Sequence, residues 1–146
     1  MPLSAHYVIM RDGVVLNPHY KNMGLYGSEY WTYLLPRRVG ERKAKELTNA
    51  CLPVGSRQAL KLGMVDYVFT GNRKNFYEMV QQFCRRISVD QKFSCELKRL
   101  SDERRKENNK KSLEEYRKDE LKIMHKNIFE NNWSFEEKRK AFVYKL

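Results

Sequence analysis

The chain has 146 residues, of which 41% are hydrophobic, 12% aromatic and 32% charged, and its formal net charge is +11. This composition predicts one small globular domain and excludes wholesale disorder, and no apolar run approaches the ~20 residues that cross a bilayer. The amino terminus lacks the basic flank and apolar stretch of a secretory signal, so we expect a cytoplasmic protein without a membrane partner.

The first half of the chain predicts short strands and helices in alternation. HYVIM and VVLN, on either side of the Asp12-Gly13 turn, predict a β-hairpin. Ser28 is a candidate N-cap for a helix that should end or kink at Pro36. The next predicted elements are two helices and a strand, at residues 41–50, 55–63 and 64–69.

From Asn72 onward the pattern is helical. Six residues, Phe76, Met79, Val80, Phe83, Cys84 and Ile87, recur at helical spacing and predict a helix with one apolar face. Two later sites match the capping-box pattern, Ser112 with Glu115 and Ser134 with Glu137. They predict a helix from Leu113 to about Phe129 and a last helix that ends in KAFVYKL. The fold class is therefore α/β and mostly helical.

The basic residues of this second half alternate with acids, as in LKRLSDERRKENNKKSLEEYRKDELK. Such a pattern is typical of solvated helix faces, and the interleaved aromatic residues that stack on bases are missing, so we expect no nucleic-acid partner. Cys51, Cys84 and Cys95 show no CxxC spacing, which favours reduced, mostly buried thiols over disulfides or a metal site.

Residues 17–40, NPHYKNMGLYGSEYWTYLLPRRVG, place five aromatic residues around a single acid, Glu29. A carboxylate in a poorly hydrated aromatic pocket can accept and return a proton near neutrality, and a phenol can donate a hydrogen bond or relay the proton. The stretch is therefore a candidate site. The alternative is that Glu29 is a surface acid at a helix start, where the helix dipole favours it.

Two motifs carry a family resemblance. The run VG..KA.EL at residues 39–47 and the run A...G.VD.V at residues 59–68 resemble the crotonase (enoyl-CoA hydratase/isomerase) superfamily. Residues 16–40 and the terminal FVYK are similar more specifically to the HypX (HoxX) family, which are maturation proteins of nickel–iron hydrogenases.

The resemblance implies a function as well as a fold. HypX-like proteins join a formyltransferase-like domain to a crotonase-like domain, pass a formyl group from formyl-tetrahydrofolate to coenzyme A, and release carbon monoxide. The implied architecture is the C-terminal portion of a crotonase-like fold, with a partial core at residues 1–71 and a helical region of the same domain at residues 72–146. The implied ligand is an acyl- or formyl-CoA, with no metal, and formyl-tetrahydrofolate would bind only through an N-terminal domain absent here.

The resemblance also implies partners. We expect the hydrogenase maturation machinery, and either a missing N-terminal half or a homo-oligomer, and we expect the isolated chain to be inactive. A hairpin without its usual parallel neighbours predicts dimerisation, or apolar surface left open around Val8, Met10, Val14 and Leu16.

Aligning RRVG with the superfamily places Tyr20 where hydratases carry one catalytic glutamate, with Glu29 in the glycine-rich turn nearby. The resemblance thus implies that Tyr20 and Glu29 are the proton-handling pair. The other pocket candidates are His19, Tyr26, Ser28 and Tyr30, and the candidates for coenzyme A phosphates are Lys21, Arg37 and Arg38. Helix packing, a loop position or solvent exposure explains each of these equally well.

Two other functions stay open. The first is an ordinary enoyl-CoA hydratase or isomerase, against which the tyrosine at position 20 argues. The second is a non-catalytic helical interaction module, which the mixed-charge helices would also serve.

Overall fold

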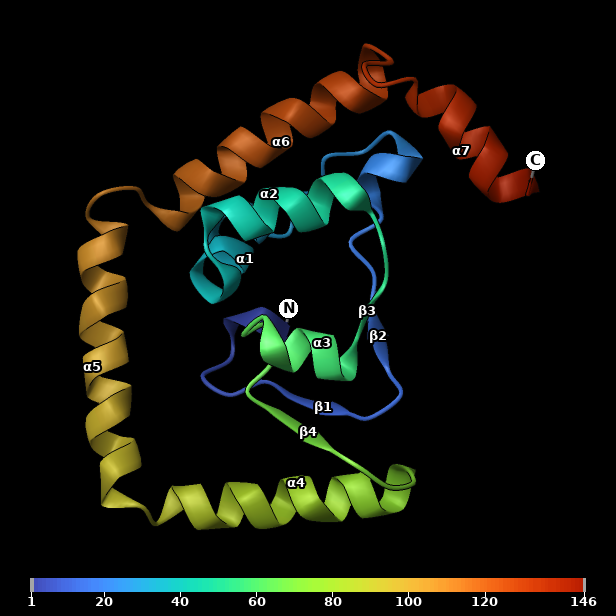
Figure 1. The fold of residues 1–146 in the computed structure, drawn as a ribbon. Helices are drawn as coiled ribbons and strands as arrows, with labels where there is room; N and C mark the ends of the chain where they lie inside the picture. The colour runs from blue at the N-terminus through green and yellow to red at the C-terminus, as the bar shows by residue number, and fades with distance from the viewer. Residues whose placement is uncertain (1, 146) are drawn as a thin grey trace.

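The computed structural model describes residues 2–145 as a small mixed core with a long helical extension wrapped round it (Figure 1). The α-helices are α1 Trp31–Val39, α2 Glu41–Ala50, α3 Ser56–Lys61, α4 Arg73–Ser88, α5 Gln91–Asn108, α6 Leu113–Phe129 and α7 Phe135–Tyr144. The strands are β1 Ile9–Arg11, β2 Val15–Leu16, β3 Val54–Gly55 and β4 Tyr67–Phe69, and the 3-10 turns are η1 Pro2–Ser4 and η2 Tyr20–Met23. The predicted mostly helical fold is confirmed.

The predicted pairing of the first two strands is wrong, although both strands form. β1 pairs in parallel with β4, with Met10 opposite Val68, and β2 pairs antiparallel with β3, with Leu16 opposite Val54. The Asp12-Gly13 turn is present, with Gly13 at a positive φ of 81°. However, the Asp12 carboxylate accepts a hydrogen bond from Ser56 Oγ at 2.6 Å, which draws the turn toward the start of α3 and separates the two strands.

The core lies between α1, α2, α3 and the two strand pairs. It consists of Val8, Met10, Leu35, Ala44, Val54, Ala59, Met64 and Val65. Ala59 is fully buried and Ala44 is 1% exposed, so α2 and α3 approach the strands closely at residues with small side chains. Val8 and Met10 are buried members of this core, so the expectation that these two side chains are open is wrong, whereas Val14 is exposed and Leu16 is half-buried.

Arg38 and Asp66 fasten α1 to this core. The guanidinium of Arg38 donates to both Asp66 carboxylate oxygens, at 3.0 and 2.8 Å, and to the carbonyl of Ala5 at 2.8 Å. Asp66 Oδ2 also accepts the N–H of Val8 at 2.7 Å. Asp66 of the VD.V motif therefore joins α1 to Val8, just before β1. Arg38 of RRVG and Asp66 thus both have a structural role.

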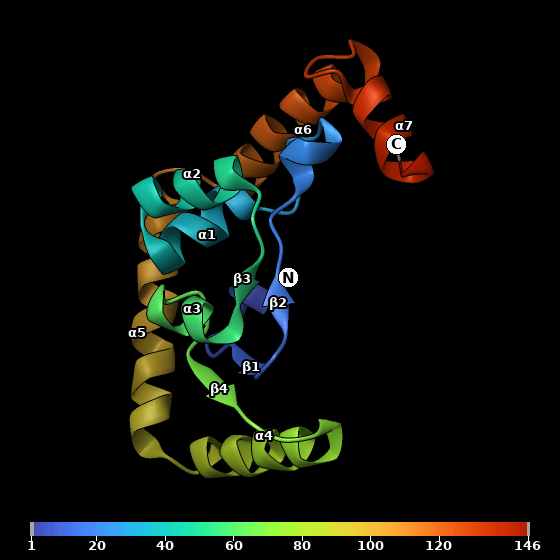
Figure 2. The same cartoon turned by 45° about the vertical axis from the view of Figure 1, so that its right-hand side comes forward.

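The helical region follows three sides of the core. Figures 1 and 2 show α4 beside β4, α5 at a right angle to it, α6 crossing over α1 and α2, and α7 turning away at the far end. Phe83 of α4 is 5% exposed and contacts Tyr67, Phe69 and Tyr7, with ring centroids 4.8, 6.4 and 5.5 Å away. This aromatic cluster attaches α4 to the core.

Helix caps only partly follow the sequence pattern. The predicted capping box at Ser112 and Glu115 is confirmed, with both reciprocal bonds present at the start of α6. The predicted cap at Ser28 is wrong, because Tyr30 is the N-cap of α1, whereas Ser134 is the N-cap of α7 as predicted but forms no capping box with Glu137. Ser134 has a φ of 56° and makes no side-chain cap, and Asn131 Oδ1 instead accepts the N–H of Glu136 at 2.9 Å. The start of α1 is capped from α6, as described below.

Of the three cysteines, only Cys51 is buried, whereas Cys84 and Cys95 are exposed, so the expectation of mostly buried thiols is wrong for two of them. Cys84 follows the buried Phe83 but itself faces solvent, although the helical spacing places it in the apolar stripe. No helix within residues 2–145 is both long and apolar enough to cross a membrane.

Phe83→Ala should lower the free energy of unfolding by roughly 3–5 kcal/mol, because it removes the centre of the aromatic cluster and leaves a cavity. Chemical denaturation measures the change. The control is Tyr77→Ala, since Tyr77 of the same helix is 52% exposed and should change stability little. Equal losses in both variants would contradict the packing described for α4.

Candidate functional site

A largely apolar cavity of about 400 Å³, here called the Tyr20 cavity, lies between η2, the start of α1 and the core. Its lining includes Tyr20, Lys21, Tyr26, Glu29, Trp31 and Trp133, together with core residues such as Val8, Leu35 and Met64. Tyr20 is half-buried and Glu29 is exposed, and the two side chains meet at the rim of the cavity, where the Tyr20 phenol donates a hydrogen bond to the Glu29 carboxylate; burial and this bond raise the pKa of Tyr20. The structure thus brings together the two residues that the sequence singled out.

The loop between η2 and α1 needs glycine at position 27. Gly27 has a φ of 88°, and a Cβ there would lie 3.1 Å from the ring of Tyr20 and 3.2 Å from that of Trp31. The absence of a side chain therefore lets both rings pack against the loop. Trp31 Nε1 donates to the carbonyl of Tyr26 at 2.8 Å, which fixes one aromatic wall of the cavity.

Three side chains of α6 hold this loop through its backbone. Asn127 Oδ1 accepts the N–H of Tyr26 at 3.0 Å, and Met124 Sδ accepts that of Gly27 at 3.1 Å. Glu120 accepts from the N–H of Tyr30 at 2.8 Å, and from the N–H and the hydroxyl of Thr32 at 3.0 and 2.5 Å.

Sequence reasoning missed these three residues. The spacing 120, 124 and 127 places the three side chains on one helix face, but nothing in the sequence indicates that Glu120 and Asn127 are fully buried.

The electrostatics of the site act on the phenols. Burial raises the pKa of Tyr20, and hydrogen bonding to the Glu29 carboxylate together with its negative charge raises that pKa further. Burial also raises the pKa of Tyr26, with a second contribution from the charge of Glu120. Both phenols therefore stay protonated well above neutral pH and can donate a hydrogen bond.

The other pocket candidates are dispersed. His19 stacks on Tyr20 and Phe142, with centroids 6.1 and 6.4 Å away, and its Nδ1 lies 2.9 Å from the carbonyl of Asn17. Neither His19 nor Ser28 belongs to the cavity lining, whereas Tyr26 does. Tyr30 turns to the other side of α1, because it sits at the helix start in a left-handed conformation with a φ of 59°.

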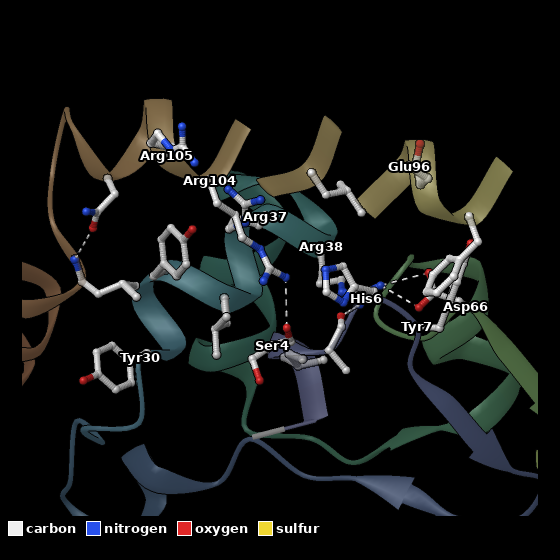
Figure 3. Close-up of a pocket in the computed structure, with 18 residues that line it drawn as sticks. Ser4, His6, Tyr7, Tyr30, Arg37, Arg38, Asp66, Glu96, Arg104 and Arg105 are labelled. Atoms are coloured by element: carbon white, nitrogen blue, oxygen red, sulfur yellow. Dashed lines mark hydrogen bonds and ion pairs between the residues drawn. The ribbon is translucent and has the colours of Figure 1, made fainter. Parts of the chain in front are cut away.

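The phosphate candidates lie apart. Lys21 lines the Tyr20 cavity and its Nζ donates to Asn49 Oδ1 at 2.9 Å. Arg37 and Arg38 line a second cavity of about 870 Å³, between residues 3–7, α1 and α5. Figure 3 shows them facing Arg104 and Arg105 of α5 across this second cavity. Arg37 is paired with Glu107 and Arg38 with Asp66, so both arginines already have acidic partners.

A family model described as Enoyl-CoA hydratase/isomerase matches residues 1–146, which is the whole chain. The chain belongs to the enoyl-CoA hydratase/isomerase family. This crotonase family acts on coenzyme A thioesters, and the apolar Tyr20 cavity with a lysine among its lining residues is compatible with such a ligand. Within residues 2–145 no group of three or more His, Cys, Asp and Glu side chains could hold a metal ion.

The chain is similar to the carboxy-terminal part of the HypX/HoxX proteins. It is 39% identical to the hydrogenase maturation factor HoxX of Bradyrhizobium diazoefficiens, over all of this chain and 26% of the relative. The crystal structure of HypX from Aquifex aeolicus in complex with tetrahydrofolic acid superposes with a TM-score of 0.84 and 37% identity, over 98% of this chain and 26% of that one. The chain therefore spans about a quarter of these relatives.

The general fold is shared more widely. An enoyl-CoA hydratase/isomerase from Pseudoalteromonas atlantica T6c superposes with a TM-score of 0.78 at 22% identity, over 98% of this chain and 55% of that chain. At this identity the likeness concerns the fold alone.

Titration of the phenols tests the geometry at the rim. Because the folded pKa of Tyr20 is raised above the unfolded value near 10, its contribution to stability is complete below about pH 10 and is lost as the pH rises through the folded pKa. Glu29→Gln should lower the pKa of Tyr20, as measured by tyrosinate absorbance against a Tyr20→Phe reference. Glu114→Gln, a change of an exposed acid on α6, should leave it unchanged, and an equal response in both variants would refute the contact.

Proposed function

We propose that this chain is the crotonase-like part of a HypX-like hydrogenase maturation enzyme, which converts formyl-CoA into coenzyme A and carbon monoxide. The observation that carries the proposal is the pairing of Tyr20 with Glu29 at the rim of an apolar cavity, in a chain 39% identical to a hydrogenase maturation factor. The cytoplasm is the proposed setting, where thiols such as Cys84 stay reduced.

The proposed step is an elimination that needs neither water nor an oxidant. The carboxylate of Glu29 removes the formyl proton, and the electron pair of the C–H bond stays on carbon as the lone pair of carbon monoxide. The C–S bond breaks with its electrons on sulfur, and the departing thiolate takes the proton back from Glu29. The products are carbon monoxide and coenzyme A, so atoms and electrons balance.

Tyr20 has a separate role in this scheme. Its raised pKa keeps the phenol protonated, so it donates a hydrogen bond to the thioester oxygen as the C–S bond weakens. The aromatic residues Tyr26, Trp31 and Trp133 line the cavity behind the pair and limit access of water, which would otherwise hydrolyse the thioester to formate.

Lys21 is the best candidate among the three residues expected to contact the phosphates, Lys21, Arg37 and Arg38. It lines the same cavity as the reacting pair, and its partner Asn49 is neutral, so its positive charge is free to attract the nucleotide tail. Arg37 lines the other cavity and is already paired with Glu107, which favours a structural role.

Glu29→Gln, made in a full-length HypX-like protein that carries this segment, should lower carbon monoxide release from formyl-CoA by on the order of a hundredfold or more, because it keeps the shape but removes the base. Tyr20→Phe should cost less if the phenol only orients the thioester. Coenzyme A affinity should change little in either variant, because neither group is expected to hold the nucleotide tail. Gas-phase detection of carbon monoxide and binding calorimetry measure the two effects.

The control is Glu46→Gln, a change of an exposed acid on α2 that lies outside both cavities. Release of carbon monoxide at the parent rate by Glu29→Gln would reduce the carboxylate to a surface charge and overturn the proposal. Hydration of crotonyl-CoA by the parent protein, without carbon monoxide release from formyl-CoA, would favour the ordinary hydratase instead.

A further inference from the structure

Glu120 is a fully buried carboxylate that takes part in none of the ion pairs formed within residues 2–145. Buried charges are costly unless they are compensated. Here the compensation comes from the N–H groups of Tyr30 and Thr32, from the hydroxyl of Thr32, and from the positive end of the α1 dipole. A residue 88 to 90 positions away therefore does the work of an N-cap.

Glu29 lies inside the segment that α6 holds. The N–H groups of Gly27 and Tyr30, on either side of it, are bound by Met124 and Glu120. Glu29 itself is exposed, so packing does little to place its side chain. The backbone contacts of its neighbours therefore determine where the carboxylate stands relative to Tyr20.

The conformation at Tyr30 supports this dependence. Tyr30 has a φ of 59°, a left-handed conformation that a residue with a large side chain adopts only when its surroundings impose it. The bond from its N–H to Glu120 Oε2, at 2.8 Å, is such a constraint. The negative charge of Glu120 also contributes to raising the pKa of Tyr20 and of Tyr26.

We propose that Glu120 is a positioning residue for the reaction, because its bonds to Tyr30 and Thr32 fix Glu29 in line with Tyr20. This inference rests on the proposed function of the pair. It makes α6 part of the active site, although no side chain of α6 lines the Tyr20 cavity.

Amide hydrogen exchange on the whole chain tests whether Glu120 holds the backbone of Tyr30 and Thr32. Glu120→Gln should speed exchange of the Tyr30 and Thr32 amides by on the order of tenfold or more, because a charged acceptor is lost. Thr32→Val removes only the hydroxyl donor and should speed the Thr32 amide, while Thr32→Ser keeps the hydroxyl and should not. Glu114→Gln on the exposed side of α6 is the control and should leave both amides at the parent rate.

Kinetics in a full-length HypX-like protein that carries this segment test the functional part. Glu120→Gln and Thr32→Val should lower kcat for carbon monoxide release, by on the order of 10- to 100-fold for Glu120→Gln and less for Thr32→Val, with KM for formyl-CoA nearly unchanged. Thr32→Ser keeps the hydroxyl donor and should therefore have the parent kcat. A general loss of stability would instead lower the amount of active protein and leave its kcat as it was.

The outcomes separate the two proposals. If Glu29→Gln abolishes release but Glu120→Gln and Thr32→Val both keep the parent kcat, the positioning role is wrong and the proposed function stands. Should Glu120→Gln fail to fold, the Thr32 pair decides: faster exchange at Thr32 with an unchanged kcat overturns the inference. If Glu29→Gln itself releases carbon monoxide at the parent rate, the proposed function is wrong, and the positioning role that rests on it is wrong as well.

Discussion

The buried carboxylate of Glu120 at the first turn of α1 is the contact on which the site depends. A helix start leaves N–H groups without partners, and neither Ser28 nor Tyr30 supplies a side-chain acceptor. Because the acceptor comes from α6, the helical region and the loop between η2 and α1 must fold as one unit. The stripe of Glu120, Met124 and Asn127 extends that dependence along the loop.

The residues of the family motifs and the residues of the proposed site have different places in the structure. Arg38 and Asp66 join α1 to Val8, just before β1, so the RRVG and VD.V motifs stabilise the fold and help to form the wall of the second cavity. The residues of the proposed site lie elsewhere, in η2 and the loop before α1, where Tyr20, Gly27 and Glu29 gather. The fold is shared with a structure at 22% identity, and a shared fold does not by itself determine the site.

Whether the sequence predicts a contact depends on how far apart in the chain the two contacting residues lie. The helices at residues 41–50 and 113–129 and the capping box at Ser112 were predictable, because their signals are local. The strand pairing was not, because Met10 meets Val68 across 58 residues and the Asp12-Gly13 turn looks the same in a hairpin. The pairing of Tyr20 with Glu29 was expected from the family resemblance. Glu120 and Asn127, by contrast, are polar residues of a type that is usually exposed, and only the structure shows that they bind backbone N–H groups of the loop before α1.

A crystal structure of a full-length HypX-like protein that carries this segment, with acetyl-CoA bound as a thioester that has no formyl hydrogen, tests the central claim most directly. The account predicts that the acyl group enters the Tyr20 cavity and that the thioester oxygen lies within roughly 2.6–3.2 Å of the Tyr20 hydroxyl, with the Glu29 carboxylate beside the acyl carbon. An acyl group in the second cavity, which Arg37 and Arg38 line, or one out of reach of both Tyr20 and Glu29, would contradict the account.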